Sequence, residues 1–149
     1  MSQTTSTLPQ HIGYIIDGNR RWAKRHGLPP YEGHLAGYTA LKDVVRETHA
    51  AGIPYVSAYV FSTENWKRSS DEVRKLMRLV LRLVTTDLPE FQKNDIRVIV
   101  AGSREGLDQK IIAAIENAEA TIAHNASGTF VICFNYGGHK EITEMPGLS

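Results

Sequence analysis

The sequence predicts an α/β fold in a single domain, a parallel β-sheet with helices on both faces. Short apolar segments rich in β-branched and aromatic residues alternate with longer segments whose apolar residues recur at helical spacing. The strand-like segments are apolar, as is typical of parallel sheets buried between helices. The chain has 149 residues, 42% of them hydrophobic, enough for one domain with its own core. Residues 1–10 are rich in Ser, Thr and Gln, so we expect a disordered arm before a domain over residues 11–149.

The first half of the chain supplies two predicted strands and one predicted helix. Residues 11–16 and 55–61 are short runs rich in β-branched and aromatic side chains, which favours strands. Residues 35–51 place their apolar side chains on one helical face. Gly52 follows directly, where a C-terminal helix cap is expected.

A long helix is predicted over residues 69–93. Ser69 and Glu72 have the spacing of a capping box at its start, and Pro89 is expected to kink or end it. The helix is more apolar than a one-sided surface helix needs, since Leu79 lies off its main stripe. Burial between the sheet and neighbouring helices, or a dimer contact, is one interpretation. The other is one wall of an apolar tunnel for a long hydrocarbon chain.

The second half of the chain supplies two further strands and a helix. Residues 96–101 and 129–135 are apolar strand-like runs, and residues 107–124 have near-regular helical spacing. We therefore expect a sheet truncated after about four strands, with apolar surface uncovered at one edge. In open sheets of this kind ligands bind beyond the carboxyl ends of the strands, so the segments after the first two strands are the candidate sites.

Composition excludes several classes of protein. The chain has 17 Lys+Arg and 16 Asp+Glu, so no overall field selects nucleic acid or an anionic membrane. Cys133 is the only cysteine, which excludes an internal disulfide and a cysteine-based zinc site. No apolar run reaches the length of a transmembrane helix, and the first residues do not resemble a signal peptide. We expect a cytoplasmic protein.

The first candidate site follows the first strand, in the run Asp17-Gly18-Asn19-Arg20-Arg21-Trp22. A carboxylate at a strand end can hold Mg²⁺, and paired arginines offer donors to phosphate oxygens. Asn19 can cap the next helix, whose N-terminus then favours an anion. His34, after Gly33, could donate to a phosphate or be purely structural. A simple turn with solvated arginines is the alternative interpretation of the run.

The second candidate site follows the second strand. It contains Ser62, Thr63, Glu64 and Asn65, followed by Trp66 and Arg68. Hydroxyls, an amide and an arginine beside an indole suit a polar head group with an apolar or flat neighbour. Helix capping, with Trp66 in the core, is the alternative. A run of exposed polar residues directly after a buried strand favours a functional loop over simple helix capping.

These segments resemble the motifs of the cis-prenyltransferases, the undecaprenyl diphosphate synthase family. The first run with its preceding strand resembles the opening motif, and Gly33-His34-x-x-Gly37 resembles the second. Phe61-Ser62-Thr63-Glu64-Asn65-Trp66-x-Arg68-x-x-x-Glu72-Val73 resembles the third, and Asn135-Tyr136-Gly137-Gly138 a later one. The resemblance implies a Mg²⁺-dependent transferase of the cis-prenyltransferase fold. Its substrates would be isopentenyl diphosphate and an allylic prenyl diphosphate, and its product a cis-polyprenyl diphosphate of the undecaprenyl type.

The resemblance also implies roles for individual residues. Asp17 would be catalytic and hold Mg²⁺, and Asn65 would act near the proton removed from isopentenyl diphosphate. The implied substrate-binding residues are Gly18, Asn19, Arg20, Arg21, Trp22, His34, Ser62, Thr63, Glu64, Trp66 and Arg68. A homodimer, with at most peripheral membrane contact through the lipid product, is implied for the full-length family.

The chain departs from the family pattern in three places. Pro30 stands where the family usually has an arginine, and His139 follows the Asn-Tyr-Gly-Gly motif where another arginine is usual. The later Arg-x-x-x-Arg-x-Ser segment, which binds isopentenyl diphosphate in the family, has no match. We therefore expect a truncated copy that binds allylic diphosphate weakly and does not elongate it. A non-catalytic prenyl-diphosphate-binding module, or a partner subunit of a prenyltransferase complex, is the alternative.

Overall fold

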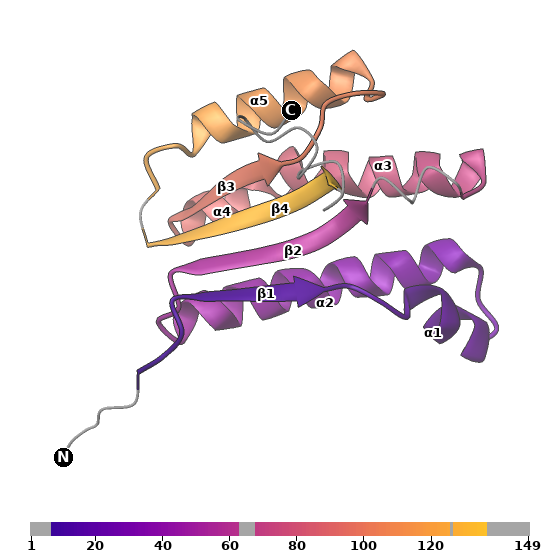
Figure 1. The fold of residues 1–149 in the computed structure, drawn as a ribbon, viewed down its shortest axis with the longest axis horizontal. Helices are drawn as coiled ribbons and strands as arrows, with labels where there is room; N and C mark the ends of the chain where they lie inside the picture. The colour runs from indigo at the N-terminus through magenta and orange to yellow at the C-terminus, as the bar shows by residue number, and fades with distance from the viewer. Residues whose placement is uncertain (1–6, 63–67, 126, 137–149) are drawn as a thin grey trace, which may run out of the picture.

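A computed structural model describes residues 7–62, 68–125 and 127–136. The four strands in this part are β1 (His11–Ile15), β2 (Tyr55–Ser62), β3 (Ile96–Ala101) and β4 (Gly128–Tyr136). The five helices are α1 (Asn19–Arg25), α2 (Pro30–Ala50), α3 (Ser70–Val84), α4 (Leu88–Lys93) and α5 (Gln109–Thr121). All strand pairs are parallel, in the order β1-β2-β4-β3 (Figure 1). The predicted parallel α/β sheet is confirmed. No helix in the described ranges combines the length and apolar character that a bilayer span requires.

Alternate side chains of β2, β4 and β3 build the core. The parallel register aligns them in two rows, Val56 with Phe130 and Val98, and Ala58 with Ile132 and Val100. Helices α2, α3 and α5 add apolar faces to the same cluster, led by Val45, Val80, Leu83, Ile115 and Ile122. At the edge strand β3, the Glu119 carboxylate of α5 accepts the Val100 N–H at 2.9 Å and so satisfies one donor of that edge.

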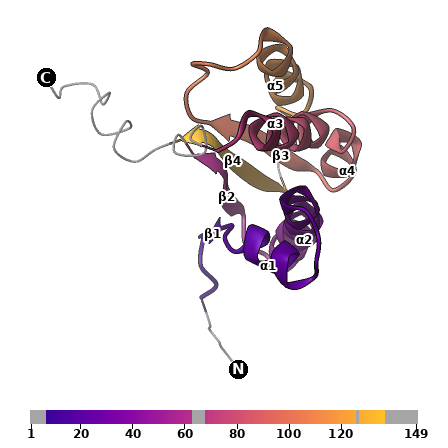
Figure 2. The ribbon, with the colours of Figure 1, turned by 90° about the vertical axis from the view of Figure 1, so that its right-hand side faces the viewer.

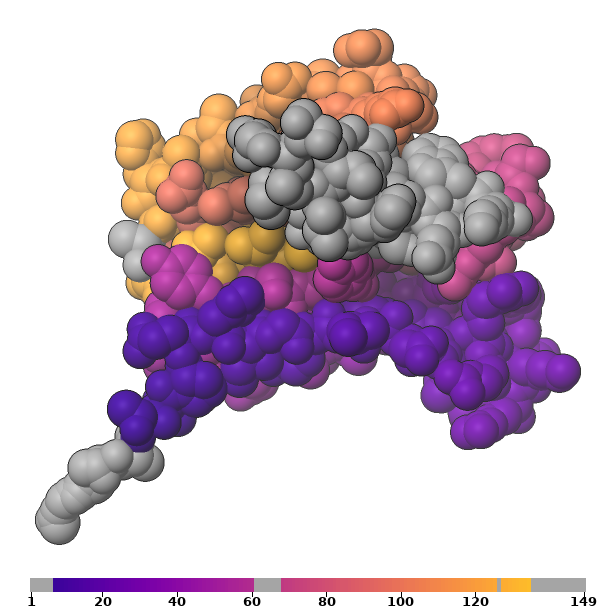
Figure 3. All heavy atoms as spheres, viewed as in Figure 1, coloured from indigo at the N-terminus to yellow at the C-terminus, as the bar shows by residue number. Residues whose placement is uncertain are grey.

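In the described part of the chain, the opposite face of β1 and β2 carries exposed apolar side chains. Ile15 is 83% exposed, and Tyr55 and Tyr59 are also exposed. Helices α1 and α2 lie on one side of these two strands, and the N-terminal strand forms part of the molecular surface on the other side (Figures 2 and 3). Apolar strand composition predicted burial on both faces, but it does not reveal which element covers each face.

Helix α2 begins earlier than predicted, at Pro30 rather than at residue 35. Proline is favoured in the first turn of a helix because its missing N–H has no partner there in any case. Pro30, one of the three departures from the family pattern noted above, thus lies at the first position of α2. As a result His34 lies within α2, and not in a loop before it.

The helix predicted over residues 69–93 is two helices, α3 and α4. The break follows Val84, and Pro89 lies in the first turn of α4 instead of ending a helix. The predicted N-terminal cap of α3 is present, since the Ser69 hydroxyl accepts the Glu72 N–H at 3.2 Å. The remaining elements begin and end within a few residues of their predicted limits.

Candidate functional site

The loop after β1 turns the chain sharply into α1. Gly18 is the residue before the helix and has a φ of 85°, a left-handed conformation that favours glycine. Asn19 is therefore the first residue of α1, and the expected side-chain cap from Asn19 is absent. The Asp17 carboxylate accepts the Gly18 N–H at 2.8 Å and lies 3.6 Å from the Arg21 guanidinium. Its side chain is 81% exposed, so it remains accessible to a ligand.

Helices α1 and α2 approach closely at two glycines of α2. A Cβ on Gly33 would collide with the Asn19 backbone, at 2.8 Å from its carbonyl carbon and closer to the oxygen. A Cβ on Gly37, one turn later, would lie 2.5 Å from the Asn19 side-chain amide. The Gly33-x-x-x-Gly37 spacing therefore places Asn19 directly against α2, which fixes the position of the loop that carries Asp17.

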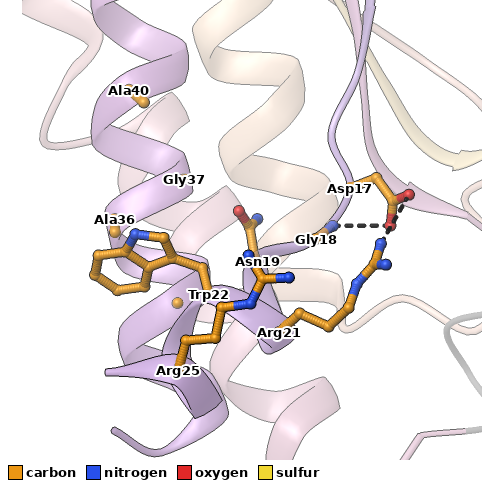
Figure 4. A pocket seen from close by; sticks show the side chains of 10 residues that line it. Asp17, Gly18, Asn19, Arg21, Trp22, Arg25, Ala36, Gly37 and Ala40 are labelled. Atoms are coloured by element: carbon orange, nitrogen blue, oxygen red, sulfur yellow. Dashed lines mark hydrogen bonds and ion pairs between the residues drawn. The ribbon is translucent and has the colours of Figure 1, made fainter. Parts of the chain in front are cut away.

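A cleft of about 540 Å³ lies between this loop, α1 and α2. Of the predicted site residues, it brings together Asp17, Gly18, Asn19, Arg21 and Trp22. Figure 4 shows Arg21 directed at Asp17, with Trp22 near Ala36 on the other side. The guanidinium groups of Arg21 and Arg25 and the carboxylate of Asp17 line the same cleft, at the carboxyl edge of the sheet. This arrangement suits a phosphorylated ligand with a metal ion.

Arg25 also lines the cleft, and the sequence analysis missed it. It follows Arg21 by four residues, and residues at that spacing share one face of a helix. Figure 4 shows its side chain extending from the last turn of α1 toward Asn19. The i, i+4 spacing of Arg21 and Arg25 was the sequence signal that could have identified it.

Arg20 points away from the cleft. Its Nε lies 3.5 Å from the Glu72 carboxylate of α3, whereas Arg21 faces Asp17. Consecutive residues of a helix project about 100° apart, which accounts for the different directions of the two side chains. In this structure the two arginines therefore face different carboxylates, and their joint role in binding a diphosphate stays a prediction.

The Glu72 carboxylate contacts three basic side chains, those of Arg20, His34 and Arg68. Its Oε2 accepts from Arg68 Nη1 at 3.1 Å and lies 3.4 Å from His34 Nε2, and its Oε1 faces Arg20. Glu72 is 9% exposed and His34 is 8% exposed. Burial lowers the pKa of His34, an effect that the Glu72 carboxylate opposes. His34 and Arg68 were predicted to bind substrate, and here both contact Glu72, which the sequence analysis placed in a capping box and in the third motif without a role in binding.

Replacement of Glu72 by glutamine is expected to lower the free energy of unfolding by about 1.5 kcal/mol. The change leaves two arginines without their buried anionic partner. The loss stays below that of a fully buried pair because the Arg20 and Arg68 side chains are 57% and 30% exposed. Urea unfolding of the 149-residue chain measures it.

The matched control is Asp71→Asn in the same turn of α3. Asp71 is exposed and pairs with Arg74 and Lys75 at the surface, so its loss is expected to cost less than about 0.5 kcal/mol. Equal losses in the two variants would contradict a special role for the Glu72 cluster.

A second, narrower cavity of about 40 Å³ lies between α2, α3 and the sheet. Its lining is mostly apolar and includes Ile16, Leu41, Val60, Leu76, Leu79, Val80, Leu83 and Ile132. Leu79 thus lies in the core, as the first interpretation of the apolar helix expected, and it also lines this cavity, while a tunnel for a long hydrocarbon chain stays a prediction. Asn19 lines this cavity as well as the larger cleft, so the two meet at the start of α1.

Several predicted site residues lie outside the described part of the chain. These are Thr63, Glu64, Asn65 and Trp66, together with the side chain of Ser62, whose backbone ends β2. Gly137, Gly138 and His139 of the later motif are also outside it. Their proposed roles stay predictions.

Asp17 fits a magnesium ion that takes most of its ligands from substrate and water. Mg²⁺ prefers oxygen ligands and is usually held by one or two carboxylates plus phosphate oxygens. The described residues contain no group of three or more His, Cys, Asp or Glu side chains arranged to hold a metal. A single exposed carboxylate in a cleft with arginines is consistent with that mode of binding, in which the diphosphate completes the site.

Comparisons with known proteins agree with this fold and motif set. Residues 15–146 match the model of the undecaprenyl diphosphate synthase family of prenyltransferases. An isoprenyl transferase of Agrobacterium fabrum is 43% identical over 94% of this chain and 57% of its own length. A trans,polycis-polyprenyl diphosphate synthase of Thermobifida fusca, (2Z,6E)-farnesyl diphosphate specific, is 44% identical over 92% of this chain and 49% of its own.

The fold is similar to that of a solved structure in complex with dimethylallyl diphosphate. Lavandulyl diphosphate synthase from Lavandula x intermedia has a TM-score of 0.87 and 32% identity, over 91% of this chain and 58% of that one. The parallel sheet, its carboxyl-edge cleft and these matches define an α/β protein of the prenyltransferase class. The chain belongs to the undecaprenyl diphosphate synthase family, and it spans about half the length of the relatives it matches.

Proposed function

We propose that this chain binds an allylic diphosphate for cis-prenyl transfer, with the diphosphate in the large cleft and the prenyl tail in the apolar cavity. The observation that carries the proposal is that the two spaces meet at Asn19. A ligand with a highly charged head and a hydrocarbon tail needs these two environments side by side. The relatives named as isoprenyl transferases and the dimethylallyl diphosphate in the lavandulyl enzyme support this choice of ligand.

Each residue of the cleft has a physical task in this proposal. Arg21 and Arg25 donate charge-assisted hydrogen bonds to diphosphate oxygens and oppose the charge that develops as the diphosphate leaves. Trp22 offers an apolar wall beside the head group. The Asn19 amide, held against Gly37, lies where the head joins the tail.

The proposed cofactor is Mg²⁺, with Asp17 as its ligand from this part of the chain. When bound, the ion neutralises diphosphate charge and polarises the bond to the leaving group. Asp17 is kept available by its position at the end of β1 and by its exposed side chain. The Gly18 N–H and Arg21 orient the carboxylate at the cleft edge.

The complete reaction requires more groups than the cleft supplies. We propose isopentenyl diphosphate as the second substrate, with Ser62, Thr63, Glu64, Asn65, Trp66 and Arg68 near it and Asn65 near the proton that leaves. An undecaprenyl-type product, a homodimeric assembly and a cytoplasmic location belong to the same proposal. The full-length relatives named isoprenyl transferase support the chemistry.

Isothermal titration of the 149-residue chain with dimethylallyl diphosphate tests the proposal. We expect binding in the presence of MgCl₂ that weakens in EDTA, with dimethylallyl alcohol as the control lacking the head group. Asp17→Asn should reduce the difference between the two buffers. Absence of diphosphate binding in both buffers would overturn the proposal.

A second assay separates a transferase from a binding module. The chain is incubated with dimethylallyl diphosphate, isopentenyl diphosphate and MgCl₂, and the products are analysed by chromatography. We expect binding without elongation by this chain alone, since it spans about half the length of its relatives. Elongated product would show that the chain alone carries the whole reaction.

A further inference from the structure

The Glu72 carboxylate lies outside both spaces of the proposed site and yet connects the helices that form them. It lines neither the large cleft nor the apolar cavity. Its partners come from three segments, with Arg20 in α1, His34 in α2 and Arg68 in the stretch just before α3. Glu72 itself lies in the first turn of α3 and is buried. One buried carboxylate therefore ties the start of α3 to both helices of the cleft.

Helix α1 depends on contacts with other elements for its position. It has seven residues, and helices of this length are not stable alone in water. Ala23 is its only buried residue. The Asn19 backbone touches α2 at Gly33, which sets the distance between the two helices. A small side chain and a backbone contact leave the rotation of α1 about its own axis weakly determined.

The ion pair between Arg20 and Glu72 supplies that missing constraint. Arg20 Nε lies 3.5 Å from the Glu72 carboxylate, and on the same helix Arg21 and Arg25 line the cleft. Residues of a helix keep fixed angles to one another, about 100° per residue, so holding Arg20 against α3 sets the directions of the other two arginines. Glu72 is held in turn by Arg68 Nη1 at 3.1 Å, which makes it a fixed partner for Arg20.

His34 ties the second helix of the cleft to the same carboxylate. It directly follows Gly33, the residue at which α1 and α2 touch, and its Nε2 lies 3.4 Å from Glu72 Oε2. Burial lowers the pKa of His34, so the ring is neutral at neutral pH, and the geometry fits a ring whose Nε2–H donates to the carboxylate. His34 lines the apolar cavity together with Asn19. Both helices are thus held to α3 at the junction of cleft and cavity.

We propose that Glu72 is a positioning residue for the diphosphate cleft, which holds Arg20 and His34 so that Arg21 and Arg25 point into the cleft. Glu72 acts through these side chains, without contact with the ligand. The inference rests on the proposed function, because it requires the diphosphate to bind at Arg21 and Arg25. It assigns Arg20 to the support of α1 instead of a direct contact with the diphosphate.

The sign of the effect on affinity separates positioning from charge. Removal of a negative charge close to an anion site should, by Coulomb attraction alone, tighten the binding of an anion. Loss of positioning has the opposite effect, because Arg21 and Arg25 must then be ordered when the ligand binds. We therefore expect Glu72→Gln to weaken the binding of inorganic diphosphate ~10-fold, although the variant carries one negative charge less.

Isothermal titration with inorganic diphosphate, with MgCl₂ present, compares the unmodified chain with Glu72→Gln and Glu72→Asp. The titrations are made without denaturant on protein that is folded by circular dichroism, so a purely stabilising role would leave the affinity unchanged. Glu72→Asp keeps the charge but withdraws the carboxylate by one methylene group, and we expect a ~3-fold loss of affinity. This variant keeps the inference testable should Glu72→Gln not fold. Asp71→Asn, an exposed neighbour, is the control and should change the affinity less than ~2-fold.

A double-mutant cycle tests the route through Arg20. Arg20→Gln alone should weaken binding ~5-fold, and its addition to Glu72→Gln should weaken binding less than ~2-fold further. Additive losses, or unchanged or tighter binding in both Glu72 variants, would overturn the inference and leave the proposed function standing. Failure of the unmodified chain to bind either inorganic diphosphate or dimethylallyl diphosphate would instead overturn the proposed function, and the inference with it.

Discussion

Replacing Gly33 with alanine is expected to lower the free energy of unfolding by about 2 kcal/mol. Helix propensity alone predicts the opposite sign, because alanine is favoured over glycine in a helix interior by about 1 kcal/mol. The added Cβ would meet the Asn19 backbone, and also Ala23 Cβ at 3.0 Å. A backbone contact cannot be relieved by turning a side chain, so α1 must move away from α2. Urea unfolding of the variant measures the loss.

Gly37→Ala is the matched comparison for this prediction. Its Cβ would meet the Asn19 side-chain amide, which can rotate away. We expect a change in unfolding free energy within about 1 kcal/mol of zero, since the favourable propensity offsets the contact. If Gly33→Ala proves as stable as Gly37→Ala, the close approach of the two helices is not what fixes the loop carrying Asp17.

Replacing Arg21 or Arg25 with glutamine is expected to weaken binding of inorganic diphosphate by at least ~10-fold in each case. The double variant should lose about 100-fold. Both guanidinium groups line the cleft, and hydrogen bonds from charged donors to phosphate oxygens are stronger than those between neutral groups. Isothermal titration with MgCl₂ present measures the change.

Lys24→Gln provides the control for charge. It removes the same single positive charge from α1, but Lys24 is exposed and does not line the cleft. At physiological salt the screening length is about 8 Å, so we expect a change of less than ~2-fold. Similar losses in Lys24→Gln and Arg25→Gln would mean that general charge, and not the cleft, determines binding.

The fold class and the general place of the cleft were predictable because their signals are local. Strand–helix alternation predicted the parallel sheet, and the capping role of Ser69 is confirmed. Asp17, Arg21 and Trp22 follow β1 directly, so the general position of the cleft followed from the order of elements. Each of these signals lies in a short stretch of sequence and can be recognised without knowing how distant segments pack.

Other features could not be predicted because local patterns do not fix how the elements meet. Pro89 lies in the first turn of α4 instead of ending a longer helix, and one face of β1 and β2 carries apolar side chains that no helix of the described residues covers. Arg20 and Arg21 are adjacent in sequence, yet one faces Glu72 and the other faces Asp17. Their separation follows from the helical rotation between neighbours.

By itself, the sequence determined the α/β class, the family resemblance and the run of charged residues at the end of the first strand. The tertiary structure decided which of those charges serve the cleft, and it brought Glu72 and Asp87 into contact with α2. His34 and Glu72 are 38 positions apart in the chain, and Tyr38 and Asp87 are 49 apart. Such pairs form only when two helices pack at one particular distance and rotation. In this chain Gly33 and Gly37 set that distance for α1 against α2, and the shared core sets it for α2 against α3.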